Sequence, residues 1–404
     1  MKILLVNKFL YPRGGSETYV LNLGKLLRAQ GHEVEYFGME DPRNVGGNRI
    51  NALVSSMELG RGALGRLGAP FRVIYSCQAR KKLRRVLEDF QPDVVHLNNI
   101  YYHLTPSVIL EAHAFRRRTG KRMKIILTAH DYQLVCPGYK LLDGQGRICE
   151  KCLGGNYLHC AANRCVKHSL AGSLLAGAEG YFWRRIPAYE KLDRIICCSE
   201  FMKTRLDTQE RFRDKTVAIC NFTDLTPEIT VEKGDYVLYF GRFSREKGIA
   251  TLLDAAERMP ETTFLLAGDP QGIGPVPENV RLVGFQKGDA LYDLIRRAKV
   301  TVCPSEWYEN CPYAVLESIA LGTPVVASRM GGIPELIRDG ENGSLFRAGD
   351  PRDLEAKLRE VLENPWLLQK YTENCFRFKL ETGDSYYEKL MVIYGEEGRL
   401  WQEN

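Results

Sequence analysis

Short apolar runs alternate with amphipathic stretches along the first half of the chain. The run "KILLVNKF" at 2–9 has the unbroken hydrophobicity that is typical of a strand buried in a parallel sheet. A helix is expected next, from an N-cap at Ser16 to a closing Gly31, because apolar residues recur at helical spacing between them. Further strands are expected at 32–38, 93–98 and 124–130, with helical stretches between them. This alternation predicts a doubly wound α/β domain.

The same alternation restarts in the second half, after a stretch at 221–235 that is expected to be a linker. The expected strands are 236–241, 262–268, 280–285, 300–305 and 324–328, and the expected helices are 248–259, 291–298 and 314–322. We therefore expect two α/β domains, at 1–220 and 236–383, and a helix at 384–404 that crosses back to the first domain. Because ligands bind outside the carboxyl ends of parallel strands, two facing domains predict an interdomain cleft as the binding site.

The composition is that of an ordinary soluble protein, with 44% hydrophobic and 26% charged residues. The first residues do not resemble a signal peptide, since their apolar run is too short. The most apolar long stretch, 169–183, is shorter than the roughly 20 residues of a membrane span and contains Glu179. These features predict a cytoplasmic protein without a transmembrane helix.

Charge is distributed unevenly along the chain, whose net charge is +6. Residues 1–225 hold 35 of the 56 lysines and arginines but only 21 of the 50 acidic residues. A basic amphipathic helix at 72–90 and a basic stretch at 116–124 favour peripheral contact with the anionic inner face of a membrane. The alternative is a basic surface that is simply solvated. A nucleic-acid partner is not expected, since there is no RNA-binding signature and no interleaved aromatic pattern.

Candidate chemistry begins with the stretch "ENCPYAVLE" at 309–317, which has a carboxylate at each end. Pro312 suits the first turn of a helix that Asn310 or Cys311 would cap, and the free N–H groups there form an anion site suited to a diphosphate. Glu317, over one turn further, could accept hydrogen bonds from two adjacent hydroxyls, while Glu309 would meet the far end of the same ligand. The alternative is a solvated loop residue at Glu309 and a helix-surface residue at Glu317.

Three other loops carry residues suited to a phosphorylated ligand. Arg242 and Lys247 lie between a strand and a helix, where two cations suit a pyrophosphate, although exposed loop cations are also common. Gly14 and Gly15 follow the first strand and would let the backbone approach a ligand, or would simply form a tight turn. His130 ends a strand, where its imidazole could bond a hydroxyl or handle a proton, or could be structural.

Taken together and in order, these residues make the chain resemble the retaining glycosyltransferases of family 4, which have the GT-B fold of two Rossmann-like domains facing a cleft. The resemblance covers nearly the whole chain and includes "DVVHLNN", "TAHDY", "GRFSREKG", "LAGD", "VGF" and "LGTPVVAS". It implies a hexosyltransferase that moves a sugar from a UDP, GDP or ADP sugar to a glycan or lipid-linked glycan in surface polysaccharide or glycolipid assembly.

The resemblance also implies roles for individual residues. Arg242 and Lys247 would bind the donor diphosphate, Glu317 the ribose, and Gly14 and Gly15 would lie under the phosphates. The catalytic pair implied at the sugar comprises His130 and Glu309, assisted by backbone groups of Asn310, Cys311, Pro312 and Tyr313. The stretch 281–285, with Val283 at its centre, would line the base pocket.

The expected chemistry is a front-face substitution in which cations and the helix end stabilise the leaving nucleotide diphosphate. No cofactor is expected for catalysis, since the chain has no Asp-x-Asp handle for a divalent ion, and it has no P-loop either. Three alternatives stay open: a nucleotide-sugar 2-epimerase, a phosphorylase on the same fold, or a non-catalytic scaffold that binds sugar nucleotides.

A cysteine-rich insertion at 136–168 holds five of the twelve cysteines within residues 136–165. Glycines and polar residues dominate between them, so the segment is expected to have no core of its own. Disulfides are unexpected there in a cytoplasmic protein. A structural zinc ion is the expected tie, held by Cys149, Cys152, Cys160 and Cys165, with Cys136, His159 or His168 as substitutes. Free buried thiols and an iron–sulfur cluster are the alternatives.

Overall fold

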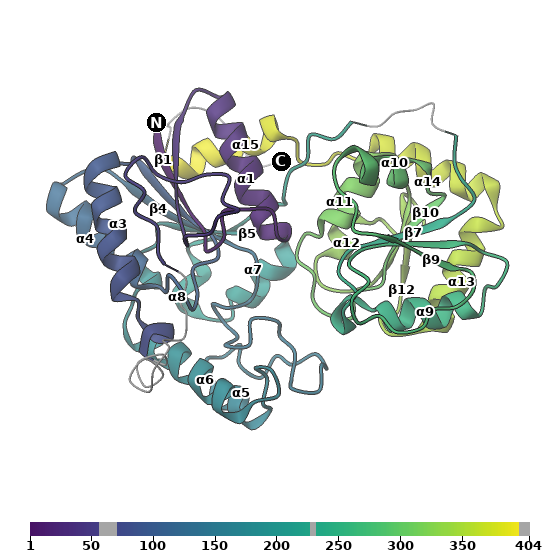
Figure 1. The fold of residues 1–404 in the computed structure, drawn as a ribbon, viewed down its shortest axis with the longest axis horizontal. Helices are drawn as coiled ribbons and strands as arrows, with labels where there is room; N and C mark the ends of the chain where they lie inside the picture. Colours follow the sequence, from purple (N-terminus) through teal and green to yellow (C-terminus); the bar gives the residue numbers. More distant parts are fainter. Residues whose placement is uncertain (56–70, 227–231, 396–404) are drawn as a thin grey trace.

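The structure is a computed structural model that describes residues 1–55, 71–226 and 232–395. It contains two six-stranded parallel sheets, each covered by helices on both faces, side by side along the long axis of the molecule (Figure 1). The alternation of strands and helices expected from the sequence is confirmed in both halves. The expected linker includes residues 227–231 and the expected final helix includes residues 396–404, and both of these ranges lie outside the described residues.

The first sheet has the strand order β2-β1-β3-β4-β5-β6. Its strands are β1 (Lys2–Val6), β2 (Glu33–Phe37), β3 (Val94–Leu97), β4 (Lys124–Ala129), β5 (Arg194–Cys197) and β6 (Thr216–Ala218). The helical segments of this half are α1 (Gly15–Ala29), α3 (Cys77–Phe90), α4 (Ser107–Thr119), α5 (Leu158–Ala162), α6 (Leu170–Arg185), η1 (Tyr189–Lys191), α7 (Glu200–Leu206) and α8 (Glu210–Arg213).

The second sheet has the order β12-β11-β10-β7-β8-β9. Its strands are β7 (Val237–Phe240), β8 (Phe264–Ala267), β9 (Val280–Gly284), β10 (Val300–Cys303), β11 (Val325–Ser328) and β12 (Gly343–Phe346). The helical segments that follow the linker are η2 (Arg245–Lys247), α9 (Ile249–Glu257), α10 (Asp289–Arg297), α11 (Tyr313–Ala320), α12 (Ile333–Leu336), α13 (Pro351–Leu362), α14 (Pro365–Arg377) and α15 (Gly383–Tyr394).

The strands are continuously apolar because each one is buried on both faces. In β1, Ile3 and Leu5 pack into the apolar cluster that includes α1, while Leu4 and Val6 pack into the cluster on the other face, which includes α3. The helices are punctuated by capping side chains: Asp350 accepts hydrogen bonds from two backbone N–H groups at the start of α13, which begins with proline.

One expected cap is wrong. The helix α1 begins two residues earlier than predicted, with Gly14 as the N-cap in place of Ser16. Ser16 lies inside the helix, and its hydroxyl accepts a hydrogen bond of 2.8 Å from the Asn99 side chain instead. The serine that local propensity favours as an N-cap therefore bonds Asn99, which follows β3, instead of capping the helix.

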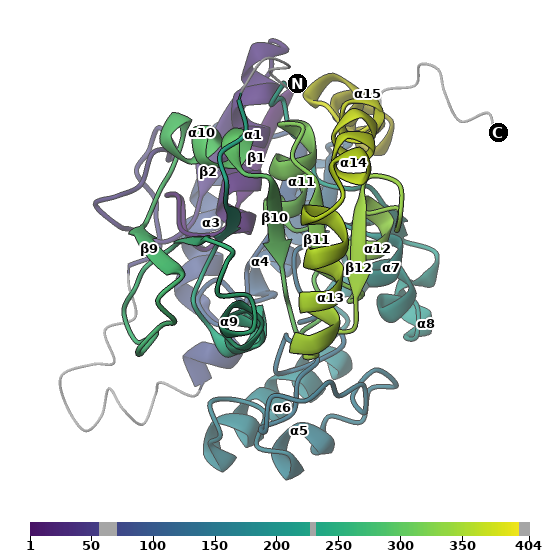
Figure 2. The same cartoon turned by 90° about the vertical axis from the view of Figure 1, so that its right-hand side faces the viewer.

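The last described helix, α15, follows the second domain in sequence but packs on the first one (Figures 1 and 2). The Tyr386 hydroxyl lies 2.6 Å from that of Tyr19 in α1, and the Tyr394 hydroxyl lies 2.6 Å from His96 Nδ1 in β3. The chain thus passes between the domains at two places, after β6 and before α15.

The predicted basic helix exists as α3, but part of its charge is directed inward. Arg80 and Arg84 bond the carboxylate of Glu111, at 2.8 and 2.7 Å, and that side chain is fully buried. Lys81 and Arg85 stay exposed and form no ion pair with the described residues. No helix among residues 1–55, 71–226 and 232–395 is long and apolar enough to cross a membrane.

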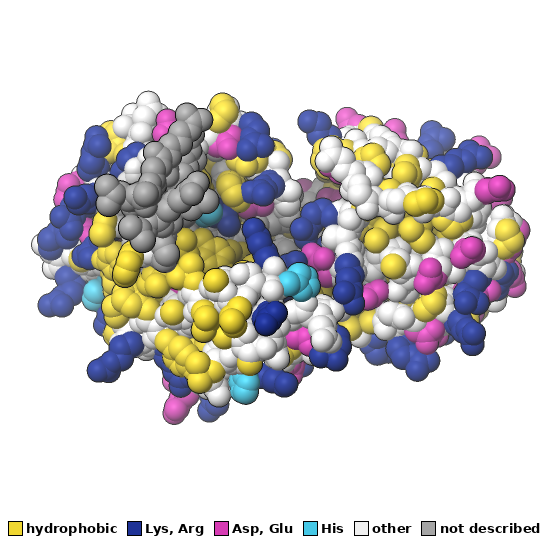
Figure 3. All heavy atoms as spheres, turned by 60° about the horizontal axis from the view of Figure 1, so that its bottom comes forward, with side chains coloured by type: hydrophobic (Ala, Val, Ile, Leu, Met, Phe, Trp, Pro, Cys, Tyr) yellow, Lys and Arg dark blue, Asp and Glu magenta, His cyan; other side chains and the backbone are white. Residues whose placement is uncertain are grey.

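Exposed apolar side chains gather on the face of the first domain seen in Figure 3, which also shows the surface hollowed between the two domains. The helices α5 and α6 contribute Leu158, Leu170 and Leu174, whose exposed fractions are 65%, 49% and 51%. The helices α5 and α6 therefore carry part of the exposed apolar surface of this domain, which also includes Phe71 and Val45, at 75% and 64% exposed.

Candidate functional site

The candidate site lies where the strand order of the second sheet reverses. β7 has β10 on one side and β8 on the other, so the connections that leave β7 and β10 diverge at the carboxyl end of the sheet. The loop after β7 carries Arg242 and Lys247, and the loop after β10 carries Glu309. Such a switch point is where open α/β sheets bind ligands.

Glu309 is the most highly coordinated side chain of these loops. Its Oε1 accepts hydrogen bonds from Lys247 Nζ at 2.5 Å, Ser305 Oγ at 2.7 Å and Trp307 Nε1 at 2.7 Å. Burial alone would raise the pKa of Glu309, but the Lys247 ammonium and the hydrogen bonds outweigh it and hold that pKa below its ordinary value. Glu309 is therefore an ionised, oriented carboxylate and not a solvated loop residue.

The start of α11 presents backbone N–H groups without a capping side chain. Its N-cap is Pro312, so the expectation that Asn310 or Cys311 caps the helix is wrong. Asn310 instead donates from Nδ2 to the carbonyl oxygen of His130 in the first domain, at 3.0 Å, and Cys311 forms a disulfide with Cys220. The first turn of α11 is consequently available for an anion.

Two buried polar atoms at this turn have no hydrogen-bond partner among the described residues. They are Oδ1 of Asn310 and the hydroxyl of Tyr313. Buried polar atoms are normally satisfied, so these two atoms are available to form hydrogen bonds with a polar ligand.

Glu317 lies in the second turn of α11. It is half-buried, and its carboxylate forms no hydrogen bond or ion pair with the described part of the chain. Burial raises the pKa of Glu317 to about 7. A desolvated carboxylate with free lone pairs is suited to accept hydrogen bonds from ligand hydroxyls.

The first domain brings His130 and the glycine loop to the same place. His130 Nε2 lies 2.9 Å from Asn98 Oδ1, and burial lowers its pKa to about 3, so the imidazole is neutral. A Cβ added to Gly15 would lie 3.5 Å from the ring of Tyr313, so the glycine loop faces the start of α11 across the two domains.

Two of the predicted site residues, Arg242 and Val283, make no hydrogen bond with the other site residues. Arg242 is exposed, and its guanidinium forms no hydrogen bond or ion pair with the described residues, although its carbonyl oxygen accepts a hydrogen bond from the Tyr239 hydroxyl at 2.7 Å. Val283 lies on β9, at the edge of the sheet, where its carbonyl accepts from the Gln286 side chain at 2.7 Å. Neither makes a hydrogen bond with the Glu309 loop.

Several residues of the site were missed by the sequence reasoning. They form a row of rings and cations that runs from the Glu309 loop into the first domain, here called the aromatic row: Trp307, Lys140, Tyr139, Tyr101, Lys8 and Phe9. Lys140 lies 5.9 Å from the ring centroids of both Trp307 and Tyr139, Tyr139 stacks on Tyr101 at 6.0 Å, and Lys8 lies 4.8 Å from Tyr101 and 5.0 Å from Phe9.

Of these residues, Trp307 could have been found, because it precedes Glu309 by two positions. The others come from three separate loops of the first domain, and no local signal links them. Lys140 also forms an ion pair of 2.9 Å with Glu246, which joins the cysteine-rich segment to the donor-side loop.

The cysteine-rich segment packs onto α6. Cys152 and Cys160 are buried in a small apolar cluster with Tyr157 and Ala176, so the segment shares a core with α6 that was not expected. Burial raises the pKa of Cys152 to about 12, which keeps its thiol protonated. Among the described residues, no group of three or more His, Cys, Asp or Glu side chains is arranged to hold a metal ion. The zinc site therefore stays a prediction without structural support.

Comparison with known proteins places the chain in a family. Residues 13–226, more than half of the chain, match the model named Glycosyltransferase Family 4, and residues 223–377 match Glycosyl transferases group 1. An uncharacterized glycosyltransferase of Methanocaldococcus jannaschii is 30% identical over 231 residues, which cover 55% of this chain and 62% of that relative. An uncharacterized 42.6 kDa protein in the cps region of Klebsiella pneumoniae is 23% identical over 84% of this chain and 88% of its own length.

Solved structures share the fold over almost the whole chain. Sucrose-phosphate synthase from Thermosynechococcus elongatus superposes with a TM-score of 0.69 at 20% identity, covering 97% of this chain and 98% of its own. Anabaena HepE, in complex with UDP-glucose, gives a TM-score of 0.66 at 17% identity, covering 97% of this chain and 100% of its own. With its two facing Rossmann-like sheets and these matches, the chain belongs to glycosyltransferase family 4 and has the GT-B fold.

Proposed function

We propose that the protein is a retaining hexosyltransferase that moves a sugar from a nucleotide-diphosphate sugar to a hydroxyl of a glycan or lipid-linked glycan. The observation that carries this proposal is the start of α11, which no side chain caps. The Lys247 cation bonds Glu309 in the loop that leads into this helix, and the Glu317 carboxylate lies one turn inside the helix without a bonding partner among the described residues. Groups suited to an anion and a carboxylate suited to hydroxyls are therefore neighbours, as a diphosphate joined to a ribose requires.

The donor is placed by matching its groups to these side chains. The diphosphate lies at the start of α11, between Lys247 and Arg242, and faces Gly14 and Gly15. The ribose hydroxyls donate to Glu317, and the base lies near Val283. Two structural neighbours support a nucleotide-sugar donor as the ligand: HepE was solved with UDP-glucose, and starch synthase IV of Arabidopsis thaliana with ADP and acarbose.

The sugar lies between Glu309 and His130. When the bond from the anomeric carbon to the diphosphate breaks, Lys247 and the start of α11 stabilise the charge that develops on the leaving oxygen. The acceptor oxygen attacks from the same face, and its proton passes to that leaving phosphate oxygen. His130 is neutral, so it orients a sugar hydroxyl through a hydrogen bond rather than acting as a charged acid.

The acceptor lies along the aromatic row, which begins at the Glu309 loop and continues into the first domain. Rings of this kind stack on the apolar faces of sugars. Lys8, which has no ion pair among the described residues, and Arg13, which lies 4.3 Å from the Phe9 ring, would pair with anionic groups of the acceptor. The Klebsiella relative from the cps region and the fold neighbour WaaB, a lipopolysaccharide outer core galactosyltransferase, support a role in surface glycan assembly.

Work on a lipid-linked acceptor would take place on the cytoplasmic side of a membrane with which the protein makes peripheral contact. Lys81 and Arg85 of α3 supply exposed cations, and Leu170 and Leu174 of α6 supply exposed apolar groups. Co-sedimentation with anionic and neutral vesicles tests this contact. Equal binding to both kinds, or binding to neither at low salt, would count against it.

The experiment for the function itself has two stages. A thermal-shift panel of UDP, GDP and ADP sugars identifies the donor, because a ligand that binds the folded state raises the unfolding temperature. NMR of the product anomer, formed with that donor and a surface glycan, then shows whether configuration is retained. The E317Q variant should lose the thermal shift, whereas E278Q, at an exposed glutamate of the same domain, should keep it. The proposal fails if no sugar nucleotide shifts the wild-type protein.

A further inference from the structure

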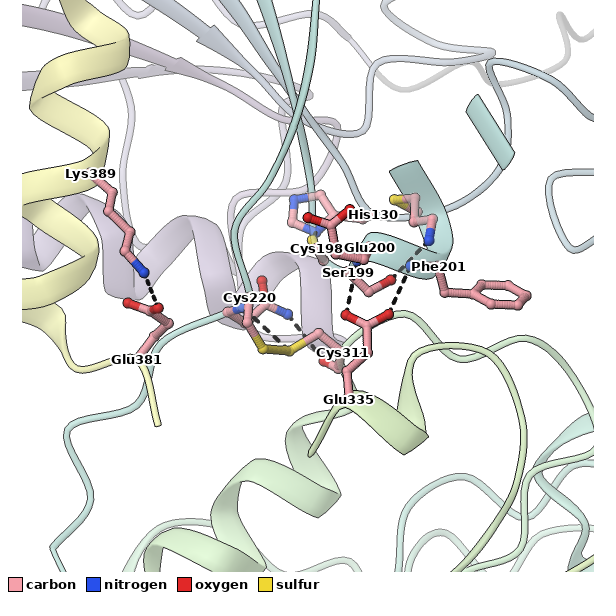
Figure 4. The surroundings of a disulfide bond; sticks show 12 residues. His130, Cys198, Ser199, Glu200, Phe201, Cys220, Cys311, Glu335, Glu381 and Lys389 are labelled. Atoms are coloured by element: carbon pink, nitrogen blue, oxygen red, sulfur yellow. Dashed lines mark hydrogen bonds and ion pairs between the residues drawn. A yellow bond between two sulfur atoms is a disulfide. The ribbon is translucent and has the colours of Figure 1, made fainter. Parts of the chain in front are cut away.

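A disulfide joins the end of the first domain to the loop that precedes α11. Cys220 lies two residues after β6, and Cys311 lies two residues before the first residue of α11, with their Cα atoms 6.2 Å apart. The two cysteines are separated by 91 positions in sequence and belong to different domains (Figure 4). The bond is therefore a covalent link between the two domains.

The link lies among hydrogen bonds that also join the two domains. Asn221 donates from its backbone N–H to Cys311 Sγ at 3.3 Å and from its side chain to the Cys311 carbonyl at 3.1 Å. The Glu335 carboxylate accepts from the backbone N–H groups of Glu200 and Phe201, at 2.9 and 2.7 Å, at the start of α7 (Figure 4). Hydrogen bonds of this kind exchange with water when domains move apart, whereas a disulfide does not.

The two sulfur atoms differ in their surroundings. Cys311 is buried, while Cys220 is half-buried and is the sulfur that a small thiolate would reach. Attack at the accessible Cys220 sulfur makes Cys311 the sulfur that leaves. The neighbouring Cys198 packs into the same apolar cluster, and burial raises the pKa of its thiol to about 12, so it does not compete as a nucleophile.

We propose that Cys220 and Cys311 form a reversible redox site that controls movement of the donor loop and of the two domains. In the reducing direction, a thiolate such as that of glutathione attacks Cys220 Sγ, the bond to Cys311 breaks, and Cys311 leaves as a thiolate. A second thiolate then attacks the mixed disulfide and releases Cys220. The link gains two electrons while two glutathione molecules become one glutathione disulfide, and the reverse reaction restores it.

The consequence follows from the position of the link. In the disulfide form, Cys311 stays fixed to the first domain, so the loop from Glu309 to Tyr313 cannot move away with the second domain. In the dithiol form, the cleft opens and closes more freely. Because cleft opening and product release commonly limit such enzymes, the reduced protein turns over faster. This consequence for turnover rests on the proposed function, whereas the thiol chemistry does not.

The first measurement concerns the thiols alone. The full-length protein is equilibrated in glutathione buffers of different reduced-to-oxidised ratio, quenched in acid, alkylated and digested. We expect peptides that contain Cys220 and Cys311 to pass from a linked form to a doubly alkylated form as the ratio rises. Two alkylated cysteines at every ratio, or a link that no ratio reduces in the folded protein, would overturn the proposal.

The second measurement concerns movement and turnover. Hydrogen exchange of the loop from Glu309 to Tyr313 should quicken on reduction, and turnover should rise several-fold. The C220S variant should behave like reduced wild type in both buffers, and the control C77S, at an exposed cysteine outside the link, should keep the redox response. Redox-independent exchange in wild type would overturn the proposal. A redox response in exchange without transferase activity in either state would leave the link standing and reject the proposed function.

Discussion

Removing the Lys247 ammonium tests the centre of the donor site. Lys247 Nζ lies 2.5 Å from Glu309 Oε1, and their side chains are only 22% and 7% exposed. In the Lys247→Ala variant, Glu309 keeps two neutral donors, Ser305 and Trp307, but loses its cation. Truncating one partner of a buried ion pair costs about 3–5 kcal/mol, and the two remaining donors place this case near the lower end.

The same substitution weakens binding of the donor. A hydrogen bond between a charged donor and a phosphate contributes about 1.5–3 kcal/mol. The expected loss in nucleotide-diphosphate affinity is therefore roughly tenfold to 150-fold. Urea unfolding measures the first effect, and isothermal titration calorimetry with the nucleoside diphosphate of the identified donor measures the second.

Two further variants separate these effects. Lys299→Ala removes a lysine of the same domain that pairs with the exposed Asp235, and it should change the free energy of unfolding by less than about 1 kcal/mol. In a Glu309→Gln background, the stability cost of Lys247→Ala should shrink, because no buried carboxylate is left uncompensated, while the loss of nucleotide affinity persists. Wild-type nucleotide affinity in Lys247→Ala would refute the placement of the diphosphate.

Three other predictions concern Glu317, Glu335 and the cysteine-rich segment. Burial raises the pKa of Glu317 to about 7 in the folded state, whereas the unfolded state releases this proton near pH 4.5. The contribution of Glu317 to the free energy of unfolding therefore falls as the pH rises from about 4.5 to about 7. Donor affinity should increase as the pH rises through 7, because the ionised Glu317 carboxylate is the form that accepts hydrogen bonds from the ribose. A pH series by calorimetry should show this increase in wild type but not in E317Q. Glu335→Gln removes the charge that bonds the start of α7 and should lower the free energy of unfolding by about 1 kcal/mol in urea titrations, more than the exposed Glu341→Gln control. Metal analysis of untagged protein should give about one zinc per chain, lost when Cys149 and Cys152 become serine; metal-free protein that is folded and active would reject the zinc site.

Local sequence accounts well for the elements of the fold. The apolar runs become strands because both faces of each sheet are covered, and in β1 the four residues that follow Lys2 are all apolar and buried. Helix starts were less certain, since a capping residue can find a partner elsewhere. Ser16 bonds Asn99, and Asn310 bonds the His130 carbonyl, so neither caps the helix next to it.

For the candidate site too, some features could be predicted from the sequence and others could not. Sequence spacing placed Lys247, Glu309 and Glu317 correctly on two loops and a helix of one domain, because the loops after β7 and β10 adjoin wherever a sheet has this strand order. It could not show that Glu309 is held by Trp307 and Ser305, or that Lys247 is its ion-pair partner. Those contacts depend on side-chain directions that only packing determines.

The chain by itself thus determined two α/β domains, a candidate site at the carboxyl ends of their strands and the residues that mark glycosyltransferase family 4, because local periodicity and short motifs specify each of these. The tertiary structure decided which residues from distant segments meet: the aromatic row, the ion pair of Lys140 with Glu246, and the Cys220–Cys311 disulfide. No local sequence pattern predicts these contacts, because they depend on how the two sheets are oriented toward each other. A pattern with a period of two or of 3.6 residues specifies a strand or a helix but not that orientation.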